Sequence, residues 1–167
     1  MACGSGVWSL TLAGRHPGAR VTLNDWANVL EVSRGNAERL GLAERTAYLP
    51  GDIFEVALEG PYDVIVASNI FHMFAPERAE ALLRRLAGAL APDGRLAIQG
   101  PMAAGSPGQD RLAHLFSVMC LALTAGGEAH PVSRYEQLFA ATGFSLLEVH
   151  DLPAFPTMRS LIAARSA

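Results

Sequence analysis

The sequence predicts an α/β fold, a mostly parallel sheet wound on both faces by helices. Short apolar runs alternate with amphipathic stretches along residues 19–100. The most apolar run, YDVIVASN, has the composition of a strand buried on both faces. The order strand, helix, strand, helix is satisfied most simply by a doubly wound parallel sheet. The chain has 167 residues, enough for one domain spanning residues 1–167.

The individual elements follow from the apolar period and from the residues that begin and end each run. A Gly-x-Gly turn at residues 4–6 precedes a first helix. Gly41 ends the next helix, and Pro76 suits the first turn of the one after that. The expected strands are residues 19–25, 46–52, 62–69 and 95–100, and the helices that follow the first and third of them are residues 26–42 and 76–90.

The last third of the chain departs from this alternation. Two helices, residues 109–127 and 133–143, both end at glycines. FSLLEVHDL and TMRSLIAAR then read as two strands joined by the loop PAFP, an antiparallel pair at the edge of the sheet. We expect GPMAAGSPGQD, residues 100–110, to be a single mobile loop.

Composition excludes several classes of function. The net charge is −3 and the arginines are scattered, which does not indicate a nucleic-acid-binding track. Two cysteines, Cys3 and Cys120, make neither a disulfide framework nor a metal cluster, so we expect a reducing, cytoplasmic location and no metal. The longest apolar stretch is about half of the roughly 20 residues that a membrane-spanning helix needs.

Candidate ligand-binding residues stand at the ends of the predicted strands, where open parallel sheets bind their ligands. Gly4 and Gly6 would let backbone amides approach a ligand closely. Asp25, about 20 residues further on, can accept hydrogen bonds from ribose hydroxyls. Asp52 can receive an exocyclic amine, and Ile53 can cover a purine. Together these residues predict a bound adenosine.

The third position of a dinucleotide fingerprint decides between adenosine ligands. That fingerprint uses a third glycine, so that helix and strand pack closely around a pyrophosphate. Here the position is Ser9, which counts against NAD and FAD. S-adenosylmethionine (SAM) has no phosphates and does not need the third glycine, and it is the ligand we expect.

Six motifs resemble, in order and spacing, the catalytic domain of the class I SAM-dependent methyltransferases. More narrowly they are similar to the small-molecule O-methyltransferase family of plant phenylpropanoid and bacterial polyketide-tailoring enzymes. The resemblance runs over nearly the whole chain and implies a Rossmann-like sheet finished by a C-terminal antiparallel hairpin. The motifs are ACGSGVWSL, VTLNDW, LPGDIF, ASNIFHMF, LAPDGRLAI and GGEAHPVSRYEQLFAATGF.

The resemblance also implies a role for each cofactor-binding position. The methionine part of SAM would lie between Gly4 and Gly6, and the ribose would lie on Asp25. The adenine would lie on Asp52 and Ile53. Trp26, Ser68 and Asn69 would line the same cleft.

His72 is the candidate general base. It follows the strand YDVIVASN, and its place in NIFHMF resembles the catalytic histidine of the family. Methyl transfer is an in-line displacement, in which the cofactor supplies the electrophile and the protein supplies alignment. A phenol, with a pKa of about 10, is a poor nucleophile while protonated. An imidazole that titrates near neutrality can remove that proton.

Two departures from the family pattern keep other outcomes open. Gly100 and Ala129 stand where relatives often carry acidic residues, so these two positions supply no carboxylate to orient His72. Slower methylation, a base acting alone on an acidic substrate, and altered chemistry on a retained SAM site are all compatible with this. For His130, a surface or capping role is favoured over a role facing the acceptor. The weaker candidates for the site are His114 and His150, and those for the acceptor wall, with core packing as the alternative, are Met102, Phe116, Met119 and Cys120.

The leading functional hypothesis is SAM-dependent O-methylation of a small hydroxylated metabolite, aromatic or polyketide-like. The alternatives are a SAM-binding protein that does not methylate and, less favoured, an NAD-dependent oxidoreductase. The chain opens at the turn that would follow the first strand. By the resemblance we therefore expect that most of this strand is missing, together with an N-terminal domain through which relatives dimerise. The expected partners are a small-molecule acceptor and a second copy, without nucleic acid or membrane.

Overall fold

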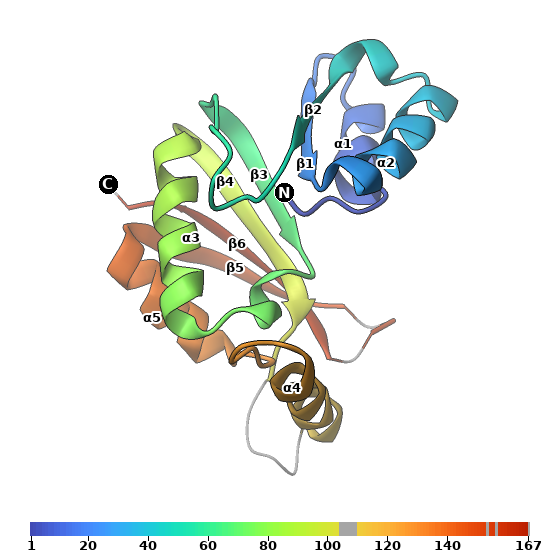
Figure 1. The fold of residues 1–167 in the computed structure, drawn as a ribbon. Coiled ribbons are helices and arrows are strands. Elements are labelled where there is room, and N and C mark those ends of the chain that lie inside the picture. Colours follow the sequence, from blue (N-terminus) through green and yellow to red (C-terminus); the bar gives the residue numbers. More distant parts are fainter. Residues whose placement is uncertain (104–109, 153, 156, 167) are drawn as a thin grey trace. The chain divides into compact units, whose positions relative to one another are not determined.

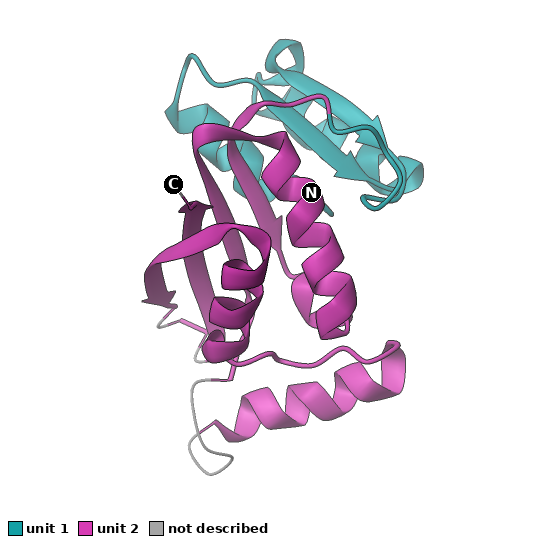
Figure 2. Ribbon diagram, turned by 90° about the vertical axis from the view of Figure 1, so that its left-hand side faces the viewer, with its two compact units in different colours: residues 1–58 teal, residues 59–167 magenta. Residues whose placement is uncertain are grey.

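The computed structural model describes residues 1–103, 110–152, 154–155 and 157–166. The chain divides into two compact units, residues 1–58 and 59–167 (Figure 2). The predicted loop over residues 100–110 and the connection PAFP lie partly outside the described residues.

The first unit is a two-stranded parallel sheet with two helices packed on one of its faces (Figure 1). The strands pair in register from Val21 opposite Thr46 to Asp25 opposite Pro50. A 3-10 turn, η1, leads into the second strand. The elements are α1 (Val7–Arg15), β1 (Val21–Asp25), α2 (Ala27–Arg39), η1 (Ala43–Arg45) and β2 (Thr46–Pro50).

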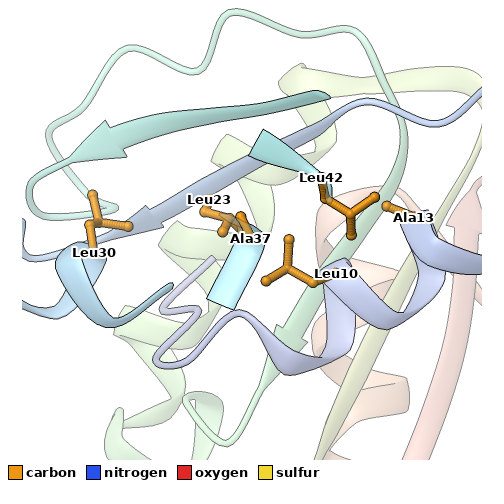
Figure 3. Packing of buried hydrophobic residues seen from close by; sticks show 6 residues of the cluster. All are labelled: Leu10, Ala13, Leu23, Leu30, Ala37 and Leu42. Carbon is orange, nitrogen blue, oxygen red and sulfur yellow. The ribbon is translucent and has the colours of Figure 1, made fainter. Parts of the chain in front are cut away.

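The core of this unit forms where the apolar faces of α1 and α2 meet β1. Successive buried positions within each helix are separated by three or four residues, which places them on one helical face. Figure 3 shows this cluster, in which every side chain is at most 3% exposed. Its members are Leu10, Ala13, Leu23, Leu30, Ala37 and Leu42.

The second unit is a four-stranded mixed sheet in the order β3-β4-β6-β5. β3 and β4 are parallel, whereas β4–β6 and β6–β5 are antiparallel. The predicted C-terminal antiparallel pair is therefore confirmed, with β5 at the edge. The elements are β3 (Tyr62–Ser68), η2 (Phe71–Met73), α3 (Pro76–Ala89), β4 (Leu90–Pro101), α4 (Arg111–Leu123), α5 (Val132–Thr142), β5 (Phe144–Asp151) and β6 (Met158–Arg165).

Two helices, α3 and α5, cover one face of this sheet (Figure 1). The helix α3 buries Leu82, Leu83 and Leu86, and α5 buries Tyr135 and Phe139. The third helix, α4, lies past the carboxyl end of β4 and buries only two of its residues, both small (Figure 1). The turn η2, which contains His72, directly follows β3 and contacts β4, and the ring of Phe116 on α4 contacts His72.

The sequence-based elements agree with the structure in order and type and differ at some ends. β4 begins at Leu90 rather than residue 95, because Leu90 already pairs with Tyr62 of β3. The helix α2 ends at Arg39, before Gly41, which adopts the left-handed φ of 67°. The prediction that β3 is buried on both faces is wrong in this structure. β3 lies at an edge of its sheet, and Val64 is 53% exposed.

Candidate functional site

In the first unit, Asp25 and the glycine turn lie together, as predicted from the sequence. The backbone N–H of Gly4 donates to Asp25 Oδ2 over 2.8 Å, and the N–H of Trp26 donates to Oδ1, also over 2.8 Å. Both carboxylate oxygens therefore have a fixed backbone donor, and each retains a free lone-pair direction. Trp26 itself is 58% exposed. The end of β1 thus presents an oriented carboxylate beside an exposed indole.

The two glycines of the turn have different surroundings. Both have left-handed φ values, 54° at Gly4 and 75° at Gly6. A Cβ added to Gly6 would lie 3.0 Å from Leu10 Cδ1 and 3.2 Å from Leu23 Cδ1, so helix–strand packing already requires a glycine there. A Cβ added to Gly4 would meet no atom within 4 Å. The close backbone approach that a ligand needs is therefore available at Gly4, whereas Gly6 serves the core.

Sequence reasoning missed two asparagines: Asn36 holds the glycine turn, and Asn24 ties the end of β1 to the residues at the end of β2. The amide of Asn36 on α2 donates to the Ser5 carbonyl over 2.8 Å. Asn24, which is 5% exposed, donates to the carbonyls of Leu49 and Gly51 over 2.9 and 3.0 Å. A buried amide within an apolar strand was the available signal, because such a group needs partners.

The predicted adenine contacts lie just beyond β2. The carboxylate of Asp52 accepts the N–H of Phe54 over 2.9 Å, so it caps its own turn. Ile53 is 7% exposed. The backbone of this turn is tied to β1 by the N–H of Gly51, which donates to the Asp25 carbonyl over 3.0 Å. Asp25, Asp52 and Ile53 therefore belong to one local framework of the first unit.

In the second unit, Ser68 and Asn69 meet Gln99, a residue that the sequence did not single out. The hydroxyl of Ser68 donates to Gln99 Oε1 over 2.5 Å, and the N–H of Asn69 donates to the Gln99 carbonyl over 2.8 Å. Asn69 has a left-handed φ of 54° and is exposed. Asparagine tolerates this backbone better than most residues. The carboxyl ends of β3 and β4 are therefore joined by a polar cluster with Asn69 on the outside.

His72 lies in the turn η2, directly after β3, as the sequence predicts. Its ring is partly buried and contacts the ring of Phe116 edge-on, with centroids 5.0 Å apart. Among the described residues, no hydrogen-bond partner reaches the buried Nδ1 atom. A Cβ added to Gly100 would lie 3.9 Å from that nitrogen, so the absence of a side chain at Gly100 leaves the nitrogen without a carboxylate. Burial, and then the nearby His130, lower the pKa of His72 from its ordinary value.

The remaining histidines have different outcomes. His130 is completely buried, so the surface interpretation is wrong. Its Nε2 atom lies 2.8 Å from the Phe74 carbonyl oxygen, which makes it a hydrogen-bonded residue of the interior. His150 is exposed and pairs with Glu148 over 2.7 Å. His114 is partly buried, and its Nε2 atom has no partner among the described residues.

The four residues expected in an acceptor wall divide into two groups. Met102 and Cys120 are buried, 0% and 3% exposed, which fits core packing. Phe116 is partly buried against His72, and Met119 is 46% exposed. Only Phe116 is therefore placed against the candidate base. Within the described ranges, no three His, Cys, Asp or Glu side chains are gathered to hold a metal, and no helix has the length and apolarity to cross a membrane.

Comparison with known proteins assigns these features to a family. Residues 1–94 match the methyltransferase domain family. The chain is 31% identical to mouse acetylserotonin O-methyltransferase over 97% of its own length and 42% of the relative's. It is 32% identical, over 76% of its length and 35% of the relative's, to the mitomycin biosynthesis 6-O-methyltransferase of Streptomyces lavendulae.

Solved structures agree with these relatives. A Nostoc punctiforme protein assigned to the O-methyltransferases superposes with a TM-score of 0.91 at 32% identity, covering 96% of this chain and 49% of that one. The mitomycin 7-O-methyltransferase superposes with a TM-score of 0.85 at 26% identity, covering 99% and 47%. The chain thus spans about half the length of the proteins it matches. From the oriented carboxylate of Asp25, the open Gly4 turn and these matches, we conclude that the chain belongs to the class I SAM-dependent methyltransferases and is similar to the small-molecule O-methyltransferases.

Proposed function

We propose that the protein containing this chain transfers a methyl group from SAM to a hydroxyl of a small, aromatic or polyketide-type metabolite, with His72 as the general base. The observation that carries this proposal is the position of His72. It follows the carboxyl end of β3, partly buried, with a lowered pKa that keeps the ring unprotonated near neutral pH. A neutral imidazole is the form that can accept a proton.

The acceptor class is supported by the relatives and by the apolar surroundings of His72. The relatives named above are O-methyltransferases, for acetylserotonin in the mouse protein and in mitomycin biosynthesis in the Streptomyces one. The ring of Phe116 contacts His72 edge-on. An aromatic edge next to the base suits a flat, apolar acceptor that carries a hydroxyl.

The residues of the first unit fit SAM. Asp25 has both oxygens oriented by backbone donors and lone pairs left for ribose hydroxyls. Trp26 is exposed beside it, and the open side of Gly4 leaves room for the methionine part. Asp52 and Ile53 are the proposed adenine contacts, and a cofactor-binding role for Ser68 and Asn69 stays a prediction from the sequence. Bound SAM supplies a methyl group on a sulfonium centre, which is a strong electrophile.

The role of His72 is to remove the hydroxyl proton. As the acceptor oxygen forms its bond to the methyl carbon, the O–H bond breaks and the proton passes to an imidazole nitrogen. The ring then returns the proton to solvent. Base catalysis of this kind contributes about 10²- to 10⁴-fold to the rate. Because Phe116 covers one side of the ring, the base is partly shielded from water.

The test is the turnover of a His72→Gln variant of the natural full-length protein. We expect kcat to fall roughly 10²- to 10⁴-fold, while the Kd for SAM, measured by calorimetry, stays within about two-fold. His150→Gln is the matched control, because His150 is exposed on β5 and far from the turn in sequence. Undiminished turnover in His72→Gln would remove His72 as the base.

A second candidate, SAM binding without methylation, is favoured by one observation. No described carboxylate contacts His72, and Nδ1 has no partner among the described residues. If Nδ1 carried the hydrogen, it would be a buried unpaired donor, at a cost of about 1–3 kcal/mol. Methyl transfer from labelled SAM to a panel of phenols decides between the two functions. Transfer in Gly100→Asp but not in the parent chain would support the second candidate for the natural protein.

We also infer that the natural protein is longer than this chain and dimerises through an N-terminal domain. The support is that the chain spans 42% of its mouse relative and 49% of the Nostoc protein. By the resemblance, a first strand and a dimerisation domain would lie in the remainder. Intact mass and light scattering of the natively produced protein test both points. A monomer with a mass near 17.7 kDa would contradict them.

A further inference from the structure

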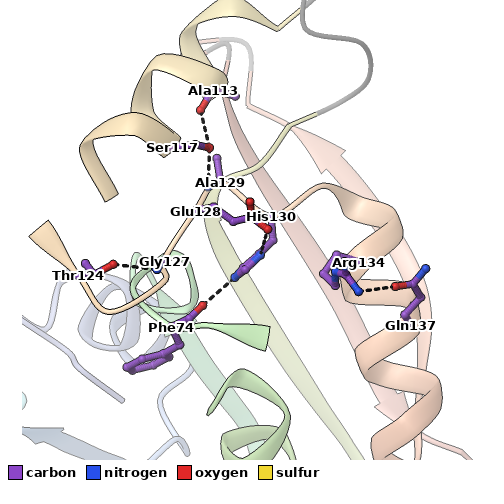
Figure 4. A network of polar contacts seen from close by, with 10 residues as sticks. All are labelled: Phe74, Ala113, Ser117, Thr124, Gly127, Glu128, Ala129, His130, Arg134 and Gln137. Atoms are coloured by element: carbon purple, nitrogen blue, oxygen red, sulfur yellow. Dashed lines mark hydrogen bonds and ion pairs between the residues drawn. The ribbon is translucent and has the colours of Figure 1, made fainter. Parts of the chain in front are cut away.

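His130 is the most deeply buried charged or chargeable side chain near the candidate base. It lies in the connection between α4 and α5, and its side chain is 0% exposed. Its Nδ1 atom is 2.9 Å from Glu128 Oε1, and its Nε2 atom is 2.8 Å from the carbonyl oxygen of Phe74 (Figure 4). Both ring nitrogens therefore have a hydrogen-bond partner, Nδ1 in Glu128 and Nε2 in Phe74.

The chemistry of the two partners dictates where the hydrogens lie. The Phe74 carbonyl can only accept, so Nε2 must donate to it. A carboxylate also only accepts, so Nδ1 donates to Glu128, or Glu128 carries the hydrogen and donates to Nδ1. In either case one proton is held between His130 and Glu128. The pair of His130 and Glu128 thus leaves Nε2 of His130 as the donor to the Phe74 carbonyl.

That carbonyl belongs to the turn that carries His72. The N–H of Phe74 donates to the Phe71 carbonyl over 3.1 Å and closes η2. The same α4–α5 connection contacts the turn at a second point. A Cβ added to Gly127 would lie 2.3 Å from the carbonyl oxygen of His72, so the two backbones are packed directly together. The N–H of Gly127 is in turn held by Thr124 Oγ1 over 2.8 Å (Figure 4).

A third contact comes from Tyr135, one turn into α5. Its ring meets Phe71 edge-on, with centroids 6.2 Å apart, and meets His130 edge-on at 6.1 Å. Phe71, His72 and Phe74 are thus each contacted by the same segment, residues 124–135. We propose that His130 is a positioning residue for His72: its hydrogen bond to the Phe74 carbonyl fixes the turn from which His72 reaches the acceptor. The inference rests on the proposed function, in which His72 is the base.

The charges around His72 support this assignment. The α4–α5 connection contributes His130 with its partner Glu128. Gly100 on β4 lies close to the ring of His72 and Phe116 on α4 contacts it, and both are uncharged. Burial first and His130 second lower the pKa of His72. A bonded His130 therefore both places the base and favours its neutral form.

The test compares two variants of the natural full-length protein. His130→Phe keeps a ring and removes the donor, whereas His130→Gln keeps an N–H near the position of Nε2. We expect kcat to fall about ten- to hundred-fold in His130→Phe, with the KM for SAM little changed, because small misplacements of a catalytic group are costly. His130→Gln should keep most of kcat. The acid limb of its pH–rate profile should move to higher pH, because His130 no longer lowers the pKa of His72. His150→Phe, which removes an exposed His–Glu pair, should change neither kcat nor the pH–rate profile.

Equal losses in the Phe and Gln variants, or a parental kcat and pH profile in His130→Phe, would overturn the assignment. Hydrogen exchange at the amides of Met73 and Phe74 and the NMR titration of the His72 ring need no turnover. We expect the amides of Met73 and Phe74 to exchange fast in His130→Phe and to stay protected in His130→Gln. If His72→Gln shows that His72 is not the base, these two readouts still decide whether His130 holds the turn. Should His130→Phe not fold, the moved titration in His130→Gln decides it.

Discussion

The turn that carries Asp25 in the first unit and the turn that carries His72 in the second are stabilised in different ways. Asp25 has both oxygens bonded by backbone N–H groups of its own unit, one of them from the next residue. His72 has a buried nitrogen without a partner among the described residues, and its turn is held by His130, 56 residues away from Phe74 in the sequence.

This difference shows which of the proposed functional residues are organised locally. Asp25, the proposed ribose partner, is oriented by the backbone of Gly4 and Trp26 within the first unit, whose core is shown in Figure 3. The proposed base is oriented by a distant connection, shown in Figure 4. Substitutions far from His72 in the sequence should therefore alter catalysis, whereas the orientation of Asp25 should respond to changes within residues 1–58.

The largest effect should come from removing the ring that supports the His72 turn. Tyr135 is 1% exposed and contacts Phe71, His130 and Phe139 edge-on or tilted. Tyr135→Ala should lower the free energy of unfolding by about 3–5 kcal/mol, because a large cavity remains. Tyr135→Phe, which keeps the ring, is the control and should lose much less. Urea denaturation followed by circular dichroism measures both, and a loss below about 1 kcal/mol in the alanine variant would contradict the packing role.

Removal of the Asp25 carboxylate should weaken SAM binding. Asp25→Ala removes the acceptor of the Gly4 and Trp26 N–H groups and the proposed ribose partner. We expect the Kd for SAM to rise roughly a hundred-fold, the equivalent of one or two charge-assisted hydrogen bonds. Calorimetric titration of SAM measures this, with Glu31→Ala on the exposed face of α2 as the control. An unchanged Kd would show that Asp25 does not bind the ribose.

The two glycines of the first turn should separate packing from binding. Gly6→Ala adds a methyl group 3.0 Å from Leu10 at a left-handed φ, so we expect about 2–4 kcal/mol of lost stability from strain and overpacking. Gly4→Ala meets open space and should cost only about 1–2 kcal/mol of backbone strain. Relative to the stability that each variant loses, the affinity for SAM should nevertheless fall more in Gly4→Ala than in Gly6→Ala. Thermal unfolding and SAM titration of both variants check this, and equal behaviour would refute the distinction.

The smallest effect should be the pH dependence that His72 adds to stability. Its folded pKa lies below the ordinary value of 6.5, so the unfolded chain binds more protons in the window below pH 6.5. The contribution of neutral His72 is thus present above pH 6.5 and is lost as the pH falls through that window. The parent should lose more unfolding free energy than His72→Gln between pH 7.5 and 5. Parallel losses in denaturant titrations at the two pH values would contradict the lowered pKa.

Several features of the site were predictable because their signals are local. A Gly-x-Gly turn, an acidic residue at the end of an apolar run and a histidine just past another run are visible in a few neighbouring residues. Strand ends of a parallel sheet meet at one edge, so the sequence placed Gly4 and Asp25 together correctly. The contact between Ser68 and Gln99 was not predictable, because a glutamine in β4 has no sequence signal for its partner 31 residues earlier.

The sequence by itself determined the order of helices and strands, the C-terminal antiparallel pair and the positions of Asp25 and His72, because hydrophobic period and turn residues act over short distances. Only the tertiary structure decided that Gly6 packs in the core while Gly4 faces open space, that Gly100 lies next to His72 Nδ1, and that His130 is buried. Those properties depend on side chains that are brought together from distant parts of the chain. Packing between them, rather than any local pattern, fixes which polar groups find a partner.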